Sequence, residues 1–188
     1  MSNLATLRYL SQSDLLNLGA NHSNSFIEAI TEGLTLHANK QFVQPLKPYL
    51  RWQGADHIAD RIIAMPCYLG GNDPIAGIKW IGSRQHNPKK FNIPRASALI
   101  VLNDSETNYP VAVMEGSLIS AMRTAAITGV SIKYLAKKDF SDITVIGCGP
   151  IAQMQIKTVL EQYAQVKKIH LFDVNPEAAE KLKALFLS

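Results

Sequence analysis

The sequence has few cysteines, no long apolar run and no concentration of charge. Its two cysteines, Cys67 and Cys148, lie far apart and lack metal-ligand spacing, so the sequence predicts neither a disulfide framework nor a metal site. A run such as Ala98–Leu102 is far shorter than the roughly 20 residues of a membrane helix, and Met1–Leu10 lacks the apolar core of a signal peptide. We therefore expect a cytoplasmic protein.

Basic residues exceed acidic residues only slightly, 19 against 15, which gives a formal net charge of +4. The densest basic groups are pairs such as Lys89–Lys90. A nucleic-acid footprint requires a basic patch or stripe, so the sequence does not predict a nucleic-acid partner. The same surplus fits a pocket for an anionic small molecule, although we expect most of it to be solvated surface.

The first 120 residues combine helices with strand-like runs. Ser13 is expected to cap a short helix over Asp14–Leu18, and an amphipathic helix is expected over Ser25–Asn39. Ser117 is expected to cap a long helix over Leu118–Ala136. Four strand-like runs lie between the helices: Arg61–Met65, Ile75–Ile81, Ala98–Leu102 and Val111–Met114. This order predicts an α+β domain that ends near residue 120.

After residue 140 the pattern changes to alternating strands and helices. Strands are expected over Asp142–Ile146 and Lys168–Phe172, and helices over Pro150–Tyr163 and Pro176–Leu187. A helical crossover between consecutive strands predicts that the strands pair in parallel. Since a doubly wound nucleotide-binding domain has about six such strands, we expect an α/β fold class in which the α+β domain is followed by an incomplete Rossmann-type βαβα unit.

Gly147, Gly149 and Ala152 form a G-x-G-x-x-A pattern between the first strand of this unit and its helix. Glycine permits the tight turn and a close approach of a pyrophosphate, and the helix N-terminus offers N–H groups. Asp173 ends the second strand, where a carboxylate binds a ribose diol, and no Arg follows it to hold a 2′-phosphate. The pattern predicts NAD rather than NADP; the alternative is a glycine-rich turn that binds nothing. Cys148 is interpreted as a small packing residue.

Several basic residues are candidates for binding an anion. Lys79 interrupts an apolar strand, where it is either an edge residue that reaches water, favoured about two to one, or a pocket cation that acts as acid or base. Arg123 lies early in the long helix beside small residues, so a surface role and a ligand role are equally compatible with its position. Lys47, Arg51 and Arg95 carry weaker signals.

Longer stretches of the sequence resemble the ornithine cyclodeaminase/mu-crystallin family of NAD(P)-dependent proteins. Met122–Ala126, followed by a helix and by Val145–Gly149, carries the general resemblance. Further stretches resemble one branch, the dehydrogenases that form 2,3-diaminopropionate for siderophores of the staphyloferrin B type: Asn21–Ser23, Phe42–Arg51, His57–Pro66, Gly77–Gly82 and Leu102–Pro110.

The resemblance implies an NAD-dependent oxidation of N-(2-amino-2-carboxyethyl)-L-glutamate. Hydride leaves the glutamate α-carbon, and water hydrolyses the resulting imine to 2,3-diaminopropionate and 2-oxoglutarate. Three substrate carboxylates make a pocket of Lys and Arg physically reasonable. The resemblance also implies a substrate-binding and dimerisation domain over residues 1–120, a homodimer through that domain, and a linking helix with the first part of the NAD-binding domain over 121–188.

Individual roles follow from the resemblance by position. Lys79 matches a catalytic lysine that meets the substrate carboxylate and helps to position the reacting centre, and Arg123 matches an arginine where substrate and nicotinamide meet. Lys47 and Arg51 compete for one further carboxylate-binding position. The positions that match cofactor contacts are Arg95, Arg123, Thr124, Gly147, Gly149, Pro150, Ile151 and Asp173. Arg95 stands where relatives often have Thr, and Pro150–Ile151 replaces their common Ala-Gln.

The family continues through the rest of the nucleotide-binding sheet and includes a further catalytic Asp, so we expect a truncated, marginally stable chain with poor catalysis. Its first nucleotide-domain strand would have an open edge, and Leu182, Leu185, Phe186 and Leu187 would lack a packing partner. Two alternatives remain. One is a relative that performs ornithine cyclodeamination or ketimine/imine reduction, and the other is a non-enzymatic module that binds or oligomerises.

Overall fold

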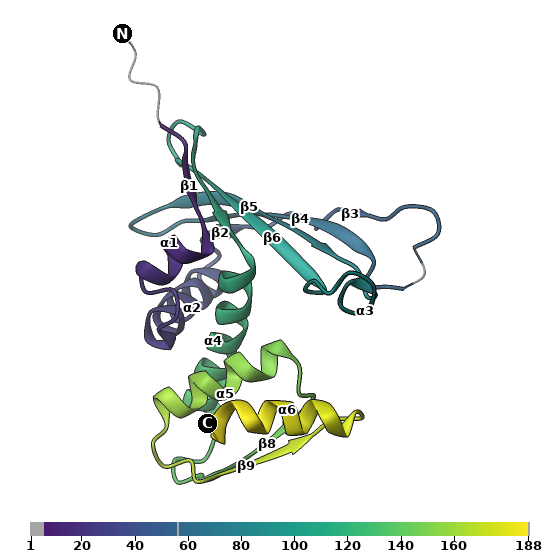
Figure 1. Cartoon of the computed structure of the whole chain (residues 1–188). Coiled ribbons are helices and arrows are strands. Elements are labelled where there is room, and N and C mark those ends of the chain that lie inside the picture. The colour runs from purple at the N-terminus through teal and green to yellow at the C-terminus, as the bar shows by residue number, and fades with distance from the viewer. Residues whose placement is uncertain (1–5, 56, 188) are drawn as a thin grey trace. The chain divides into compact units, whose positions relative to one another are not determined.

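The computed structural model describes residues 6–55 and 57–187, and the chain divides into two compact units (Figure 1). The first unit comprises residues up to 19 and 32–120, and the second comprises 20–31 and 121–188. Two helices, α2 (Ser23–Ala38) and α4 (Ser117–Leu135), therefore contribute residues to both units. No helix in the described ranges is long and apolar enough to cross a membrane.

The first unit is built on a mostly antiparallel sheet with the strand order β1-β7-β6-β5-β4-β2, and β3 also pairs with β4. The four expected strands are present and longer than predicted: β4 (Arg61–Leu69), β5 (Ile75–Ser83), β6 (Ala96–Asn103) and β7 (Pro110–Glu115). Three short strands were not predicted: β1 (Arg8–Leu10), β2 (Phe42–Val43) and β3 (Tyr49–Leu50). They are too short to show the alternation of apolar and polar residues that marks a strand in a sequence. Only their pairing with longer strands identifies them as strands.

The strand order corrects the edge interpretation of Lys79. Lys79 lies directly opposite Met65 of β4 and Ile100 of β6, so it occupies a central strand of the sheet. Its side chain is half-buried, and Nζ donates a hydrogen bond to the Ser120 hydroxyl on α4. The edge interpretation was wrong. It assumed that a lysine needs water, but on this central strand the Ser120 hydroxyl meets the ammonium group instead.

The face of this sheet opposite Lys79 carries a group of exposed apolar side chains. The strand registers place Tyr9, Tyr68, Trp80 and Leu99 together on it. All four side chains are exposed, and Trp80 and Leu99 each retain 44% of their accessible surface. We call these four residues the apolar sheet face. A patch of this composition is typical of a surface that another protein covers.

The first helix of this unit starts at a hydrogen-bonded cap. In α1 (Gln12–Asn17), the Ser11 hydroxyl accepts a hydrogen bond from Asp14 N, and the Asp14 carboxylate accepts one from Ser11 N at 2.8 Å. This reciprocal capping box replaces the predicted Ser13 cap, because only Ser11 has a carboxylate three residues later. The same hydrogen bonds lower the pKa of Asp14. The short α3 (Asn87–Phe91) was not predicted.

The second unit contains the predicted βαβα order. Strands β8 (Asp142–Ile146) and β9 (Lys168–Phe172) pair in parallel, and α5 (Pro150–Gln162) and α6 (Pro176–Leu187) follow them. In the described part of the chain, β8 pairs with β9 alone.

Helix α6 is better packed than the sequence led us to expect. Leu182 is only 3% exposed and lies in a core with Ile156 of α5, and Phe186 packs against this core. The expectation that Leu182 and Phe186 lack partners was therefore wrong, because α6 returns over the same sheet face as α5. Leu185 and Leu187 are exposed, as expected.

Candidate functional site

The glycine loop joins β8 to α5 in a tight turn. Gly147 has a φ of +91°, a left-handed conformation that glycine adopts without strain, and its N–H donates to Phe172 O at 2.8 Å. Gly149 is the N-cap residue of α5, and no side chain caps this 13-residue helix. Pro150 follows at the first helical position, where its missing N–H costs least. The remaining N–H groups of the first turn are therefore available to an anion.

The space around the two glycines fits a pyrophosphate. A Cβ atom added to Gly147 or to Gly149 would meet no atom within 4 Å. Gly149 also has an ordinary φ of −83°, so neither its backbone nor internal packing requires glycine. The missing side chain instead leaves the helix N-terminus open to a group that approaches from outside, as in dinucleotide-binding loops.

Asp173 holds this loop in place. Its Oδ2 accepts a hydrogen bond from Cys148 N at 2.7 Å, and its Oδ1 accepts one from Asn175 N at 2.8 Å. These two hydrogen bonds lower the pKa of the Asp173 carboxyl, so it is ionised at neutral pH. Each carboxylate oxygen has a second acceptor position. The residue that the sequence assigns to a ribose diol therefore also clamps the glycine loop, a role that the spacing did not reveal.

Cys148 has the environment of a packing residue. It is only 8% exposed and belongs to the core between the sheet and its two helices. Burial, together with the neighbouring Asp173 carboxylate, raises the pKa of its thiol. A raised pKa lowers the fraction of reactive thiolate, which agrees with the interpretation from sequence.

The basic candidates of the first unit lie on separate elements. Lys79 is in the middle of β5, with Nζ 3.1 Å from Ser120 Oγ. Arg51 directly follows β3, and its Nη2 donates to His57 O at 3.1 Å, which ties it to the next loop. Lys47 is exposed in the segment between β2 and β3. Arg95 is exposed and directly precedes β6.

The remaining candidates lie on the part of α4 that belongs to the second unit. Arg123 is exposed and Thr124 is half-buried, and the next two residues, Ala125 and Ala126, are completely buried. Within each unit, the structure joins Asp173 to the glycine loop and Lys79 to Ser120. The roles assigned to the individual residues stay predictions.

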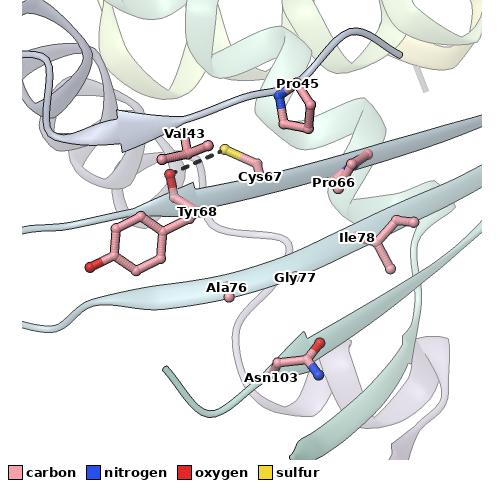
Figure 2. Close-up of a pocket in the computed structure, with 9 residues that line it drawn as sticks. All are labelled: Val43, Pro45, Pro66, Cys67, Tyr68, Ala76, Gly77, Ile78 and Asn103. Atoms are coloured by element: carbon pink, nitrogen blue, oxygen red, sulfur yellow. Dashed lines mark hydrogen bonds between the residues drawn. The ribbon is translucent and has the colours of Figure 1, made fainter. Parts of the chain in front are cut away.

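A pocket of about 350 Å³ in the first unit has different chemistry (Figure 2). Its lining is mostly apolar and contains none of the predicted basic residues. The lining residues are Val43, Pro45, Pro66, Cys67, Tyr68, Ala76, Gly77, Ile78 and Asn103. Burial raises the pKa of the Cys67 thiol. This pocket therefore does not suit a substrate with several carboxylates.

Sequence reasoning missed Ser120 completely. It lies in the first turn of α4 among apolar residues, and nothing in its local pattern distinguishes it from a helix-surface serine. Its contact with Lys79 joins two residues that are 41 positions apart. Only the position of the start of α4 against the sheet reveals this contact.

A parallel β-α-β unit with an open glycine turn and an acid directly after its second strand is the arrangement with which dinucleotide-binding folds begin. The chain belongs to the ornithine cyclodeaminase/mu-crystallin family, whose sequence profile matches residues 16–187. The predicted family and fold class are thereby confirmed.

Individual relatives agree with this assignment. The chain is 54% identical over 174 residues to N-((2S)-2-amino-2-carboxyethyl)-L-glutamate dehydrogenase of Staphylococcus aureus, covering 92% of this chain and 52% of that protein. It resembles the structure of Thermococcus litoralis Δ(1)-pyrroline-2-carboxylate reductase with NADH and L-proline, with 33% identity, a TM-score of 0.83 and coverage of 93% and 52%. It also resembles an archaeal alanine dehydrogenase dimer with bound NAD, with 31% identity, a TM-score of 0.82 and coverage of 95% and 52%. The chain thus spans about half the length of these relatives.

Proposed function

We propose that this chain acts in the NAD-dependent oxidative hydrolysis of N-(2-amino-2-carboxyethyl)-L-glutamate. The observation that carries the proposal is the open glycine loop clamped by Asp173, in a chain 54% identical to a dehydrogenase named for this substrate. The reaction consumes the substrate, NAD⁺ and water, and it yields 2,3-diaminopropionate, 2-oxoglutarate, NADH and a proton. We place it in siderophore biosynthesis in the cytoplasm, as the family resemblance implies.

The cofactor is proposed to lie along the start of α5. The Asp173 carboxylate would accept hydrogen bonds from the ribose hydroxyls, and the first-turn N–H groups beside Gly149 and Ile151 would meet the pyrophosphate. When bound, NAD⁺ supplies the hydride acceptor. We assign Arg95 and Thr124 to further cofactor contacts by position in the family.

Cationic side chains are proposed to recognise the three carboxylates of the substrate. Lys79 would hold a carboxylate beside the reacting α-carbon, and Arg123 would do so where substrate and nicotinamide meet. Either Lys47 or Arg51 would bind a more distant carboxylate. Bonds between ionised partners are shorter and stronger than neutral ones, so this set favours an anionic amino-acid derivative over a neutral one.

A second candidate function is the reduction of a cyclic imine. The likeness to the pyrroline-2-carboxylate reductase, at 33% identity over 93% of this chain, favours it. Assays with the glutamate conjugate, with ornithine and with pyrroline-2-carboxylate would separate the two, because only the proposed function releases 2-oxoglutarate from the conjugate.

Binding of NAD is the first expected result. Titration of the purified chain with NAD in a calorimeter should give saturable binding to one site per chain, and NADP should bind more weakly, because its 2′-phosphate would meet the Asp173 carboxylate. A titration without saturable heat would contradict the proposal and favour a non-enzymatic module.

Self-association through the apolar sheet face is the second expected result. The proposed homodimer would bury Trp80 and Leu99, whose exposure in one chain is unfavourable. Light scattering should give about two chain masses for the unchanged protein and one for Trp80→Lys, while Tyr134→Lys, an exposed position on α4, should leave the mass unchanged. An unaltered mass for Trp80→Lys would exclude this face as the interface.

A further inference from the structure

Within the first unit, Lys79 on strand β5 of the sheet forms a hydrogen bond with Ser120 at the start of α4. Nζ of Lys79 lies 3.1 Å from Oγ of Ser120, and both side chains are half-buried. The neighbours of Lys79 across the sheet, Met65 and Ile100, are apolar. An ammonium group at such a place is stabilised by a hydroxyl acceptor.

The start of α4 is anchored to the sheet, so Ser120 has a defined position. The Glu115 carboxylate accepts hydrogen bonds from Ser117 N at 2.6 Å and from Leu118 N at 3.1 Å, which caps the helix. Gly116 N donates to Ala98 O at 2.8 Å, and Ala98 N donates to the Ser117 hydroxyl at 3.2 Å.

The anchor reaches the strand that carries Lys79. A Cβ atom on Gly116 would lie 3.0 Å from the Cβ of Ala98, so β6 and the helix start are in close contact. Ala98 pairs with Ile81, two residues after Lys79 on β5. The first turn of α4 and the lysine are therefore parts of one hydrogen-bonded framework.

A serine hydroxyl suits a lysine that changes its protonation state. It accepts a hydrogen bond from the ammonium, and it can donate one to the lone pair of the neutral amine. A carboxylate at this place would favour the charged form alone. The hydroxyl keeps Nζ in one place in both states.

We propose that Ser120 is a positioning residue that holds the Lys79 amine in its working orientation. The inference rests on the proposed function, because that function makes Lys79 a substrate-contacting group. Ser120 itself acts only through Lys79.

The test follows the Lys79 amine directly in the 188-residue chain, without substrate or cofactor. Lysines are dimethylated with ¹³C, the Lys79 signal is assigned by its loss in Lys79→Arg, and its pH titration is recorded by NMR. In Ser120→Ala the ammonium loses the hydroxyl acceptor, so the midpoint should move down by about one pH unit. Ser120→Thr, which keeps the hydroxyl, should restore the original midpoint.

The matched control is Ser131→Ala, a serine on the same helix whose hydroxyl donates to Ile127 O. It should leave the Lys79 titration unchanged, and circular dichroism should show the same helix content in all variants. An unchanged midpoint in Ser120→Ala, or the same shift in Ser120→Thr, would overturn the inference.

A second measurement distinguishes this inference from the proposed function. The glutamate conjugate, added with NAD, should move the Lys79 signal if Lys79 contacts the substrate. If the conjugate leaves the signal unmoved while Ser120→Ala still shifts its midpoint, the proposed substrate is wrong and the control of Lys79 by Ser120 stands. If the conjugate moves the signal while Ser120→Ala has no effect on the midpoint, the proposed substrate stands and the positioning role of Ser120 is wrong.

Discussion

Replacement of Asp173 by alanine is expected to weaken NAD binding about ten- to a hundredfold, because charge-assisted hydrogen bonds to the ligand are lost. Two losses combine. The ribose hydroxyls lose a carboxylate acceptor, and the glycine loop loses the hydrogen bond from Cys148 N that holds its turn. Calorimetric titration of the unchanged chain and of the variant measures the difference.

Two further variants identify the cause of that loss. Asp173→Asn keeps one carbonyl acceptor for the loop but removes the charge, so its affinity should lie between those of the unchanged chain and Asp173→Ala. Asp142→Ala removes an exposed carboxylate of β8 that lies 3.9 Å from His170, and it should not alter NAD affinity. Equal NAD affinity in a folded Asp173→Ala would refute both the ribose assignment and the functional importance of the clamp.

Replacement of Gly77 by alanine is expected to destabilise the first unit by about 3 kcal/mol. A Cβ atom at this position would lie 2.5 Å from Val101 O and 3.1 Å from a Leu102 methyl carbon. Since Val101 O is a backbone atom of the adjacent strand β6, relief would require separating two paired strands. Urea unfolding followed by tryptophan fluorescence measures the change, because both tryptophans, Trp52 and Trp80, lie in this unit.

The same strand offers the control. A Cβ atom on Gly82 would lie 3.7 Å from a side-chain carbon of Ile62, an ordinary contact. Gly82→Ala should therefore change the free energy of unfolding by less than about 1 kcal/mol. Equal losses in the two variants would show that the general cost of replacing strand glycines, rather than the close approach of β6, determines the result.

The sequence predicted best where the signal is local. The bounds of β8, β9 and α6 were predicted without error, because short apolar strands alternate there with a glycine turn and helix-starting prolines. The cap of α1 was missed by two residues, although Ser11, unlike Ser13, is followed by a carboxylate three positions later, which is the spacing of a capping box.

By itself, the sequence determined the family, the α/β class and the glycine loop with its acid, because each depends on residue types at fixed short spacings. Only the tertiary structure decided that Lys79 lies on a central strand, that Ser120 meets it, and that Asp173 clamps the loop. It also decided that α6 buries Leu182. These contacts join segments far apart along the chain, and local periodicity carries no information about which distant strand or helix becomes a neighbour.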